Sequence, residues 1–203
     1  MKQKGKFIAI EGVEGAGKST AIGMIKDILE TQNIAFILTR EPGGTTLGEA
    51  LRTVIIEQDM DARTELLLFY AARIQLVEKV IKPALNEGKW VIGDRFELST
   101  FAYQGGGRGI DNDMIQRLSL FALQGFKPDY QIYLDIDPLL GLERVKQRGA
   151  LDRIEQENID FFNRTRQVYL DYVNTHDDIT MIDARLPINT IHDKINEIIT
   201  QLI

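Results

Sequence analysis

Short apolar runs alternate with longer segments of helical periodicity along most of this sequence. The runs are too continuously apolar for strands with one face in water, so they predict strands that are buried on both faces. The alternation of strand and helix favours a parallel sheet covered by helices on both sides, with ligands bound at the carboxyl ends of the strands. The predicted strands are residues 7–10, 34–38, 90–92, 130–136 and 179–182.

Several helical segments have recognisable ends or faces. A predicted helix over residues 19–30 ends near Asn33, and a second over residues 65–87 ends at Gly88, a residue type common just after helices. Asp111 is expected to cap the start of a helix that ends near residue 125. The apolar face of a helix near the end of the sequence is formed by Ile191, Ile195, Ile198 and Leu202.

Length and composition are those of one domain. The sequence has 203 residues, of which 44% are hydrophobic, so residues 1–203 are expected to form a single domain with a small mobile insert. Cysteine is absent, which excludes disulfides and thiolate-bound metals. The net charge of -6 argues against nucleic-acid binding. No apolar run approaches the roughly 20 residues that span a bilayer, and no secretory leader is expected, so the prediction is a cytoplasmic protein without a membrane partner.

Residues 12–19 match the phosphate-loop pattern G-x-x-x-x-G-K-[ST] between a predicted strand and a predicted helix. Glycines let backbone N–H groups turn towards phosphate oxygens, and the helix N-terminus adds partial positive charge. Lys18 is expected to reach the β- and γ-phosphates, and Ser19 to bind Mg²⁺; the alternative is a chance glycine-rich turn, which the combined pattern and context disfavour. The predicted ATP-binding residues of this segment are Gly12, Val13, Glu14, Gly15, Ala16, Gly17, Lys18, Ser19 and Thr20.

A phosphate loop leaves three classes of protein open: a GTPase switch, an ATP-driven motor and a small-molecule kinase. The sequence contains neither a guanine-reading Asn-Lys-x-Asp motif nor an Asp-x-x-Gly switch. A motor normally needs a longer chain or further domains. The kinase remains, and it requires a second anion site for the acceptor and a cover that excludes water.

Charged residues follow two further predicted strands. Asp94 can act as the acid near Mg²⁺, and Arg95 then lies where the phosphate of an acceptor would meet the γ-phosphate; the alternative for this pair is a surface ion pair. Residues 39–44, with the sequence Thr-Arg-Glu-Pro-Gly-Gly, place charge beside a rigid turn at the same edge of the sheet. Arg52 is expected on the helix that follows.

Aromatic and hydrogen-bonding residues near these charges suit a nucleobase. Phe69 and Arg73 are spaced i, i+4 and share a helix face, where a stacking ring lies one turn from a guanidinium. Phe69 could instead belong to the core. Thr100, Tyr103 and Gln104 share a second helical face, with two hydrogen-bonding side chains around an aromatic ring.

Two further segments combine glycine with arginine. Residues 105–109, four glycines and one arginine, predict a flexible loop or a mobile linker. Arg144 and Arg148 are spaced i, i+4, and Arg153 follows after a glycine that could act as a hinge. Such a segment could close and supply guanidinium to a transferring phosphoryl group, although a solvated charged face is the alternative.

Together these motifs resemble those of bacterial thymidylate kinases. The motifs are the phosphate loop with Glu14, residues 39–44, 69–73, 94–95, 102–105 and 151–153. The resemblance implies a P-loop kinase of the α/β class, with a five-stranded parallel sheet, helices on both faces and a small mobile lid at about residues 144–157. It also implies transfer of the γ-phosphoryl group of ATP-Mg to dTMP for dTTP synthesis, with Mg²⁺ as the metal, a cytoplasmic location and a homodimer.

The resemblance assigns roles to matching positions. Phe69 would stack on thymine, Arg73 would bond a base carbonyl, and Arg95 would hold the acceptor phosphate. Tyr103 would occupy the space that a ribose 2′-hydroxyl needs. The implied dTMP-binding residues are Glu14 (at the 3′-hydroxyl), Glu41, Arg52 (assisting Arg95), Phe69, Arg73, Arg95, Thr100 and Gln104 (at the base edge) and Tyr103, and the adenine of ATP would lie near Arg144 and Arg185.

The family supplies its catalytic arginine from the phosphate loop or from the lid, and this phosphate loop contains no arginine. The sequence therefore resembles the lid-arginine type, with Lys18, Arg95, Arg148 and Arg153 as catalytic residues. Phe96 departs from the family, in which Tyr or His commonly follows the Asp-Arg pair, and it is assigned no functional role. The alternatives are a deoxynucleoside kinase, which needs no clamp for an acceptor phosphate, and a nucleotide-binding regulatory protein.

Overall fold

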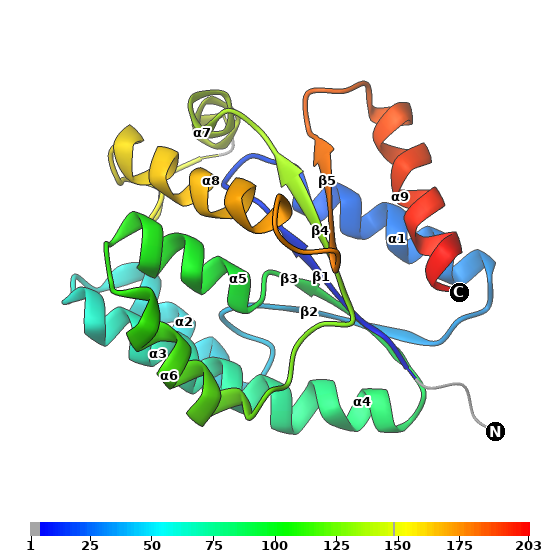
Figure 1. The fold of residues 1–203 in the computed structure, drawn as a ribbon, viewed down its shortest axis with the longest axis horizontal. Helices are drawn as coiled ribbons and strands as arrows, with labels where there is room; N and C mark the ends of the chain where they lie inside the picture. The colour runs from blue at the N-terminus through cyan, green and yellow to red at the C-terminus, as the bar shows by residue number, and fades with distance from the viewer. Residues whose placement is uncertain (1–4, 148) are drawn as a thin grey trace.

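One parallel sheet forms the centre of the protein (Figure 1). The computed structural model describes residues 5–147 and 149–203, and in this part of the chain five strands lie in the order β2-β3-β1-β4-β5, with every neighbouring pair parallel. The predicted fold class is confirmed, and each predicted strand overlaps an observed one, although the strand predicted over residues 34–38 begins and ends two residues later. The strands are β1 (Phe7–Glu11), β2 (Phe36–Arg40), β3 (Trp90–Asp94), β4 (Tyr130–Asp135) and β5 (Ile179–Asp183).

Each of these strands ends on a charged residue at the carboxyl edge of the sheet. In β1 to β3 these are Glu11, Arg40 and Asp94, and in the register of the sheet Arg40 pairs with Asp94. The apolar residues before them supply the burial that holds each strand in the sheet. The sheet therefore carries its charged side chains to one edge, where ligands of parallel sheets bind.

Helices cover both faces of the sheet. In Figure 1, α1 and α9 lie on one side and α3, α4 and α6 on the other. The helices are α1 (Lys18–Thr31), α2 (Thr46–Glu57), α3 (Ala62–Leu76), α4 (Lys82–Asn86), α5 (Glu97–Thr100), α6 (Asn112–Leu123), α7 (Pro138–Lys146), α8 (Ile159–Val173) and α9 (Ile188–Leu202), with π-helical segments η1 (Val77–Ile81) and η2 (Phe101–Gly107).

Alternate residues of β1 face different parts of the core. Ile8 and Ile10 belong to a buried cluster that includes residues of α1 and α9, whereas Phe7 and Ala9 belong to another that includes residues of α3, α4 and α6. The period of two is that of a strand buried on both faces. At the edge of the sheet, β2 is less enclosed, and Leu38 is 46% exposed.

The helix predicted over residues 65–87 is wrong in its continuity. The segment starts earlier, because Asp61 accepts a hydrogen bond from the N–H of Arg63 and caps α3. It then passes through the π-helical turn η1 into α4, whose first turn contains Pro83. Proline has no N–H and clashes with the carbonyl four residues earlier, so the wider π turn before it accommodates the ring. The predicted cap at Asp111 is confirmed.

The flexible loop predicted over residues 105–109 is also wrong in its first part, because the first three glycines complete η2 and two of them are buried. A Cβ on Gly106 would lie 2.7 Å from Cγ2 of Val168, and a Cβ on Gly107 would lie 2.4 Å from Cε2 of Phe161. Both neighbours belong to α8. The glycines therefore let η2 and α8 pack in direct contact.

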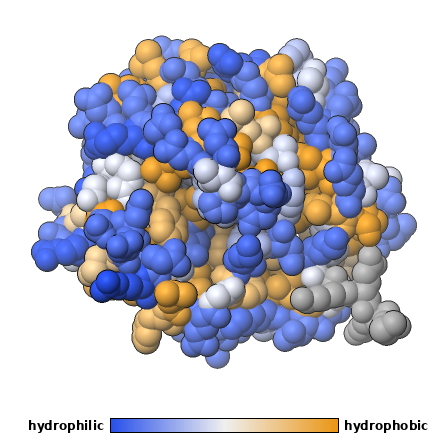
Figure 2. Space-filling view, viewed as in Figure 1, coloured by the Kyte–Doolittle hydropathy of each residue, from blue (hydrophilic) through white to orange (hydrophobic). Residues whose placement is uncertain are grey.

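The face of the molecule in Figure 2 is mainly hydrophilic, with hydrophobic residues scattered among the polar ones. In the described ranges, no helix combines the length and the apolar character that a membrane span needs.

Candidate active site

The phosphate loop connects β1 to α1 and has the backbone conformation that its glycines permit. Gly12, Gly15 and Gly17 have φ values of 149°, 73° and 92°, and Lys18 is the first residue of α1. Nζ of Lys18 donates to the carbonyl oxygens of Gly12 (3.1 Å) and Val13 (3.4 Å), so the ammonium lies across the loop. Burial lowers the pKa of Lys18 to about 8. The loop thus presents a cation and the N-terminus of a helix to the same space.

Helix α7 packs against this loop without an intervening side chain. A Cβ on Gly15 would lie 2.1 Å from the carbonyl oxygen of Gly141, and a Cβ on Gly141 would lie 2.3 Å from the carbonyl oxygen of Glu14. Arg144, about one turn further along α7, donates through Nη1 to the carbonyl oxygen of Gly15 at 3.3 Å. Backbone contact of this closeness fixes the position of α7 relative to the loop.

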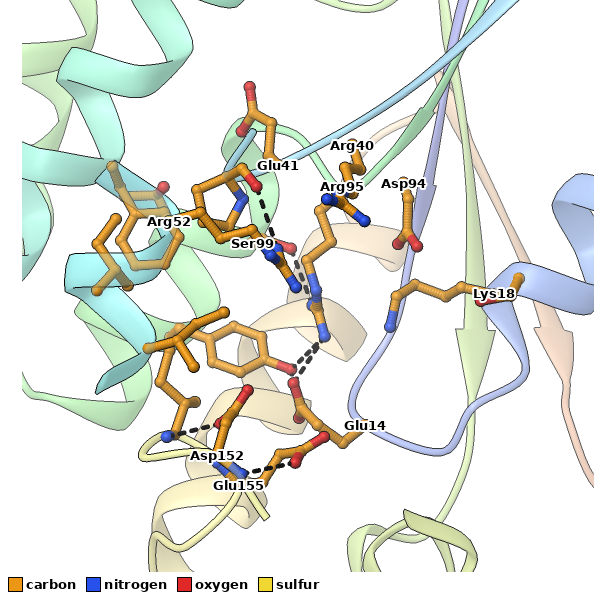
Figure 3. A pocket seen from close by; sticks show the side chains of 18 of the residues that line it. Glu14, Lys18, Arg40, Glu41, Arg52, Asp94, Arg95, Ser99, Asp152 and Glu155 are labelled. Atoms are coloured by element: carbon orange, nitrogen blue, oxygen red, sulfur yellow. Dashed lines mark hydrogen bonds and ion pairs between the residues drawn. The ribbon is translucent and has the colours of Figure 1, made fainter. Parts of the chain in front are cut away.

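A cleft of about 420 Å³ opens beside the phosphate loop (Figure 3). Its walls come from the loop, the ends of β2 and β3, helices α2 and α3, the segment from α5 to η2, and the three residues Asp152, Ile154 and Glu155. The cleft brings together most of the residues predicted to bind the acceptor and the phosphates. They are Glu14, Gly15, Gly17, Lys18, Ser19, Thr20, Glu41, Arg52, Phe69, Arg73, Asp94, Arg95, Thr100, Tyr103 and Gln104.

Arg95 is held in the middle of the cleft by three side chains (Figure 3). Its Nη2 donates to Glu14 (2.7 Å) and to the hydroxyl of Tyr103 (3.0 Å), and its Nη1 donates to Oγ of Ser99 (3.1 Å). The Tyr103 hydroxyl donates to the other oxygen of Glu14 at 2.6 Å. The backbone φ of Arg95 is 70°, a left-handed conformation that few non-glycine residues adopt. This turn aims the guanidinium into the cleft that Lys18 also lines.

Glu11, which the sequence analysis did not single out, lies behind this turn. Its buried side chain accepts hydrogen bonds from the N–H of Phe96 (2.8 Å), Oγ of Ser99 (2.6 Å) and the hydroxyl of Tyr169 (3.0 Å). Burial raises the pKa of Glu11, and these hydrogen bonds together with Arg95 oppose that effect. Glu11 thus holds Ser99, which accepts a hydrogen bond from the Arg95 guanidinium, and the backbone N–H of the residue that follows Arg95. A charged residue directly after an apolar run is the sequence signal that could have found it.

Arg73 also lines the cleft and is buried, with 1% of its surface exposed. Its Nε donates to Glu41 at 2.7 Å, and its Nη2 donates to the carbonyl oxygen of Phe96 at 3.3 Å. Burial raises the pKa of Glu41 to about 7, and the attraction of Arg73 opposes the shift. The Phe96 ring centroid lies 5.4 Å from the guanidinium carbon. Phe96, to which the sequence analysis assigned no functional role, contacts Arg73 with its ring and accepts a hydrogen bond from it at the carbonyl oxygen.

Several buried polar atoms of the cleft lack a hydrogen-bond partner. Within residues 5–147 and 149–203 these atoms are Oε1 of Glu41, Nη1 of Arg73, Oδ1 of Asp94 and Oγ1 of Thr100, and the remaining one, Oγ1 of Thr39, lies in a groove that Asp94 also lines. Buried polar atoms are nearly always paired in native proteins. Their concentration in one cleft indicates groups that bind a ligand.

Phe69 and Arg52 lie on the helices that flank the cleft. In the described part of the chain, Phe69 belongs to neither buried cluster and lines the cleft, which disfavours the interpretation as a core residue. Nη1 of Arg52 donates to the carbonyl oxygen of Pro42 at 3.1 Å. Burial and the neighbouring Arg40 lower the pKa of Arg52. Both side chains are therefore available to a bound molecule.

A second pocket, of about 270 Å³, adjoins the phosphate loop. It shares Gly17 and Thr20 with the cleft, and its other walls include apolar residues of α1, Arg144 and the segment that follows β5. Arg185 belongs to that segment, is exposed, and pairs with Asp183 at 2.7 Å. The two cavities together could hold one elongated ligand that crosses the loop.

The predicted lid arginines lie differently from the rest of the site. Arg153 donates through Nε to the carbonyl oxygen of Ile55 (3.0 Å) and through Nη2 to Glu65 (2.5 Å), whereas its neighbour Asp152 lines the cleft. Arg148 lies outside the described residues. Glu65 is a further residue that sequence reasoning missed, because an acidic residue in the first turn of a helix is ordinarily a solvent-exposed one.

A phosphate loop after the central strand of a parallel sheet, facing a cluster of arginines across one cleft, defines a P-loop kinase. The family model described as thymidylate kinase matches residues 10–195. The chain is 55% identical over 203 residues to a thymidylate kinase of Legionella pneumophila (strain Corby), covering 98% of this chain and 96% of that protein. It is 53% identical over 199 residues to a thymidylate kinase of Pseudoalteromonas translucida (strain TAC 125), covering 97% and 96%. The chain therefore belongs to the thymidylate kinase family.

Proposed function

We propose that the cleft transfers the γ-phosphoryl group of ATP to dTMP, giving dTDP and ADP for dTTP synthesis. The observation that carries the proposal is that Lys18 and Arg95 line the same cleft. One cation can hold the phosphates of the donor while the other holds the phosphate of the acceptor, which places the reacting groups side by side. Family membership supplies the identity of the two substrates.

The acceptor base would lie at the end of the cleft that Arg73 closes. Thymine would stack on Phe69, and Nη1 of Arg73 would donate to a base carbonyl. Thr100 and Gln104 would contact the polar edge of the base. Among the residues that the structure describes, Nη1 of Arg73 and Oγ1 of Thr100 are buried without a hydrogen-bond partner. These two atoms support the arrangement, because a bound base would give both of them a partner. Glu41 would hold Arg73 in place.

The sugar and phosphate of the acceptor would lie between the base and the phosphate loop. Glu14 would accept a hydrogen bond from the 3′-hydroxyl, and the ring of Tyr103 would fill the space of a 2′-hydroxyl. Arg95, assisted by Arg52, would bind the phosphate. The hydrogen bonds that already join Glu14, Tyr103 and Arg95 support this proposal, because they hold all three side chains in one geometry.

The donor would occupy the phosphate loop, with its adenine in the second pocket near Arg144 and Arg185. Ser19 and Asp94 would hold Mg²⁺, since a hydroxyl and a carboxylate are the oxygen ligands that this ion prefers. The buried and, within the described ranges, unpaired Oδ1 of Asp94 fits such a ligand. When bound, the ion would neutralise charge on the β- and γ-phosphates. Lys18 would bind oxygens of the same phosphates.

The catalytic arginine would come from the lid, as Arg148 or Arg153. Arg153 would have to exchange Glu65 and the carbonyl of Ile55 for the transferring phosphoryl group. Such an exchange would deliver the guanidinium when both nucleotides are bound, and this timing would protect ATP from hydrolysis in a site without acceptor.

The protein would act as a homodimer in the cytoplasm. The neighbouring helices α2, α3 and α6 support a self-association surface, because each leaves large apolar side chains exposed: Val54, Leu67, Met114 and Phe121, with Phe121 77% exposed. Sedimentation of the wild type and of Phe121→Lys would test this, and a wild type that sediments as a monomer would contradict it.

An ADP-release assay with dTMP, dUMP, UMP and thymidine tests the proposed reaction. We expect efficient turnover of dTMP and none of thymidine, because Arg95 and Arg52 need an acceptor phosphate. Turnover of thymidine in preference to dTMP would instead indicate a deoxynucleoside kinase. ATP binding without turnover of any acceptor would indicate a regulatory protein.

A further inference from the structure

Glu65 is a buried carboxylate that several donors share. It lies in the first turn of α3, and its side chain is 1% exposed. Nε2 of Gln104 donates to its Oε1 at 2.8 Å, Arg108 donates to both of its oxygens at 3.2 and 3.1 Å, and Arg153 donates to Oε2. One side chain therefore contacts a residue of the cleft and two arginines that lie behind it.

The charge of Glu65 determines which end of the Gln104 amide can form a hydrogen bond with it. Burial opposes the charge, but the hydrogen bonds from Arg108, Gln104 and Arg153 outweigh burial and hold the pKa of Glu65 below its ordinary value. An ionised carboxylate can only accept hydrogen bonds. The amino end of the Gln104 amide must therefore face Glu65, although nothing in a glutamine side chain itself favours one orientation of the amide over the other.

Gln104 carries this orientation into the cleft. Its side chain is 1% exposed and lines the cleft together with Thr100 and Arg73. Because Nε2 is fixed on Glu65, the carbonyl oxygen is the acceptor that the amide can offer to a base. We propose that Glu65 is a specificity-determining residue: by fixing the Gln104 amide, it makes the acceptor site select a pyrimidine with a hydrogen on N3 over cytosine. This inference rests on the proposed function, in which Gln104 contacts the base edge.

Thymine and cytosine differ at the atoms that this arrangement would contact. N3 of thymine carries a hydrogen and donates, whereas N3 of cytosine carries a lone pair, and an amino group replaces the carbonyl at C4. The fixed Oε1 of Gln104 would accept from thymine but would face the lone pair of cytosine. A buried mismatch of this kind leaves polar groups unpaired, which typically weakens binding by roughly 10- to 100-fold.

Glu65→Gln tests the proposal with little change in shape. A neutral amide at this position can accept as well as donate, so Gln104 can present either end to the base. The ratio of kcat/KM for dTMP to kcat/KM for dCMP should fall at least about tenfold. The ratio for dTMP to dUMP should stay constant, because both bases donate from N3. If Glu65 only stabilises the fold, the variant will turn over all three substrates more slowly with both ratios unchanged, and the proposal is then wrong.

Arg108→Gln is the matched control. It removes a partner of Glu65 but keeps the hydrogen bond from Gln104, so the dTMP to dCMP ratio should remain that of the wild type. If Glu65→Gln fails to fold because its arginines lose their counter-charge, the double variant Glu65→Gln/Arg108→Gln removes one charge of each sign. This double variant should show the lower ratio. Equal ratios in it and in Arg108→Gln would overturn the proposal.

Calorimetric binding of dTMP and dCMP gives the same ratio without turnover, so the role of Glu65 can be decided separately from the reaction. A wild type that fails to phosphorylate dTMP contradicts the proposed function, whereas a wild type that binds dCMP as well as dTMP contradicts the role of Glu65. In a Gln104→Ala background, Glu65→Gln should change the ratio no further, because Glu65 acts through Gln104. An equal further loss there would mean that Glu65 acts elsewhere.

Discussion

The phosphate loop and the proposed acceptor side of the cleft are built in different ways. Under the proposed function, the phosphates of the donor would lie on one continuous segment, residues 12–20, whose backbone and one ammonium would face them. The acceptor side is assembled from β2, β3, α2, α3 and η2, and it depends on buried side chains that hold one another, such as Arg73 with Glu41 and Arg95 with Glu14. Charge alone can be bound by local backbone, whereas a base and a sugar need side chains that only the complete fold brings together.

The largest effect is expected at the lid arginines, which belong to neither side and would supply the catalytic guanidinium. Arg148→Ala or Arg153→Ala should lower kcat by about 10³- to 10⁵-fold with little change in either KM, because the guanidinium stabilises charge that develops on the transferring phosphoryl group. Steady-state kinetics with ATP and dTMP varied in turn would measure this. Partial rescue by Lys would show that charge suffices, and no rescue would indicate bidentate geometry. If the double variant also keeps its kcat, the catalytic cation lies elsewhere.

The acceptor side should respond next, through Phe69. Phe69→Ala should raise the KM for dTMP and lower kcat/KM by roughly 10- to 100-fold, because a stacked base gains about 1–3 kcal/mol from an aromatic ring in ground and transition states alike. The KM for ATP and the melting temperature should hardly change. A variant that melts far below the wild type with a normal KM would assign Phe69 to the core instead.

A smaller effect is expected at the sugar. Tyr103→Ala should reduce the preference for dTMP over its ribose counterpart about tenfold, because the ring no longer excludes a 2′-hydroxyl. Tyr103→Phe is the control, since it keeps the ring and loses only the hydroxyl that bonds Glu14 and Arg95. Competition between the two acceptors measures the preference. Equal discrimination by the wild type and Tyr103→Ala would remove Tyr103 from the sugar site.

The smallest expected effect is at the phosphate loop, where ATP binding should be accompanied by the uptake of part of a proton. Since the pKa of Lys18 is lowered to about 8, roughly half of this group is uncharged at pH 8. Phosphate favours the charged form and raises the pKa again, so ATP binding at pH 8 should take up as much as about half a proton, and much less at pH 6.5. Calorimetry in buffers of different ionisation enthalpy measures the uptake. The same uptake by Lys18→Met would show that another group titrates.

The difference between the two sides also explains what the sequence could predict. The phosphate loop, the strands and the pair Asp94-Arg95 are local patterns, so a short stretch of sequence is enough to predict each of them. Because the loop and the pair directly follow strands, the same stretch also places them at the carboxyl edge of the sheet. Helical spacing singled out Arg73 and Tyr103, the resemblance to a known family predicted what each would contact, and the structure brings both into one cleft. Their roles there stay predictions until the variants above are measured.

Residues that act through distant partners escaped prediction. Glu11 meets Tyr169 across 158 positions, and Glu65 meets Arg153 across 88, so no window of sequence contains both members of either pair. The glycines of η2 were interpreted as a loop, because a run of glycine is locally typical of one. Their packing against α8 involves a helix elsewhere in the chain, so the local sequence does not indicate it.

Gly141 is a position where a substitution that normally stabilises a helix is expected to be harmful. It lies inside α7, where an alanine would ordinarily favour the helix by about 1 kcal/mol, so a propensity-based design would replace it first. In this protein the added methyl group would meet the carbonyl oxygen of Glu14 at 2.3 Å, and the helix would have to move off the loop. If all twenty residues are tested at position 141 and active variants are selected, every residue other than glycine should therefore be depleted, including alanine.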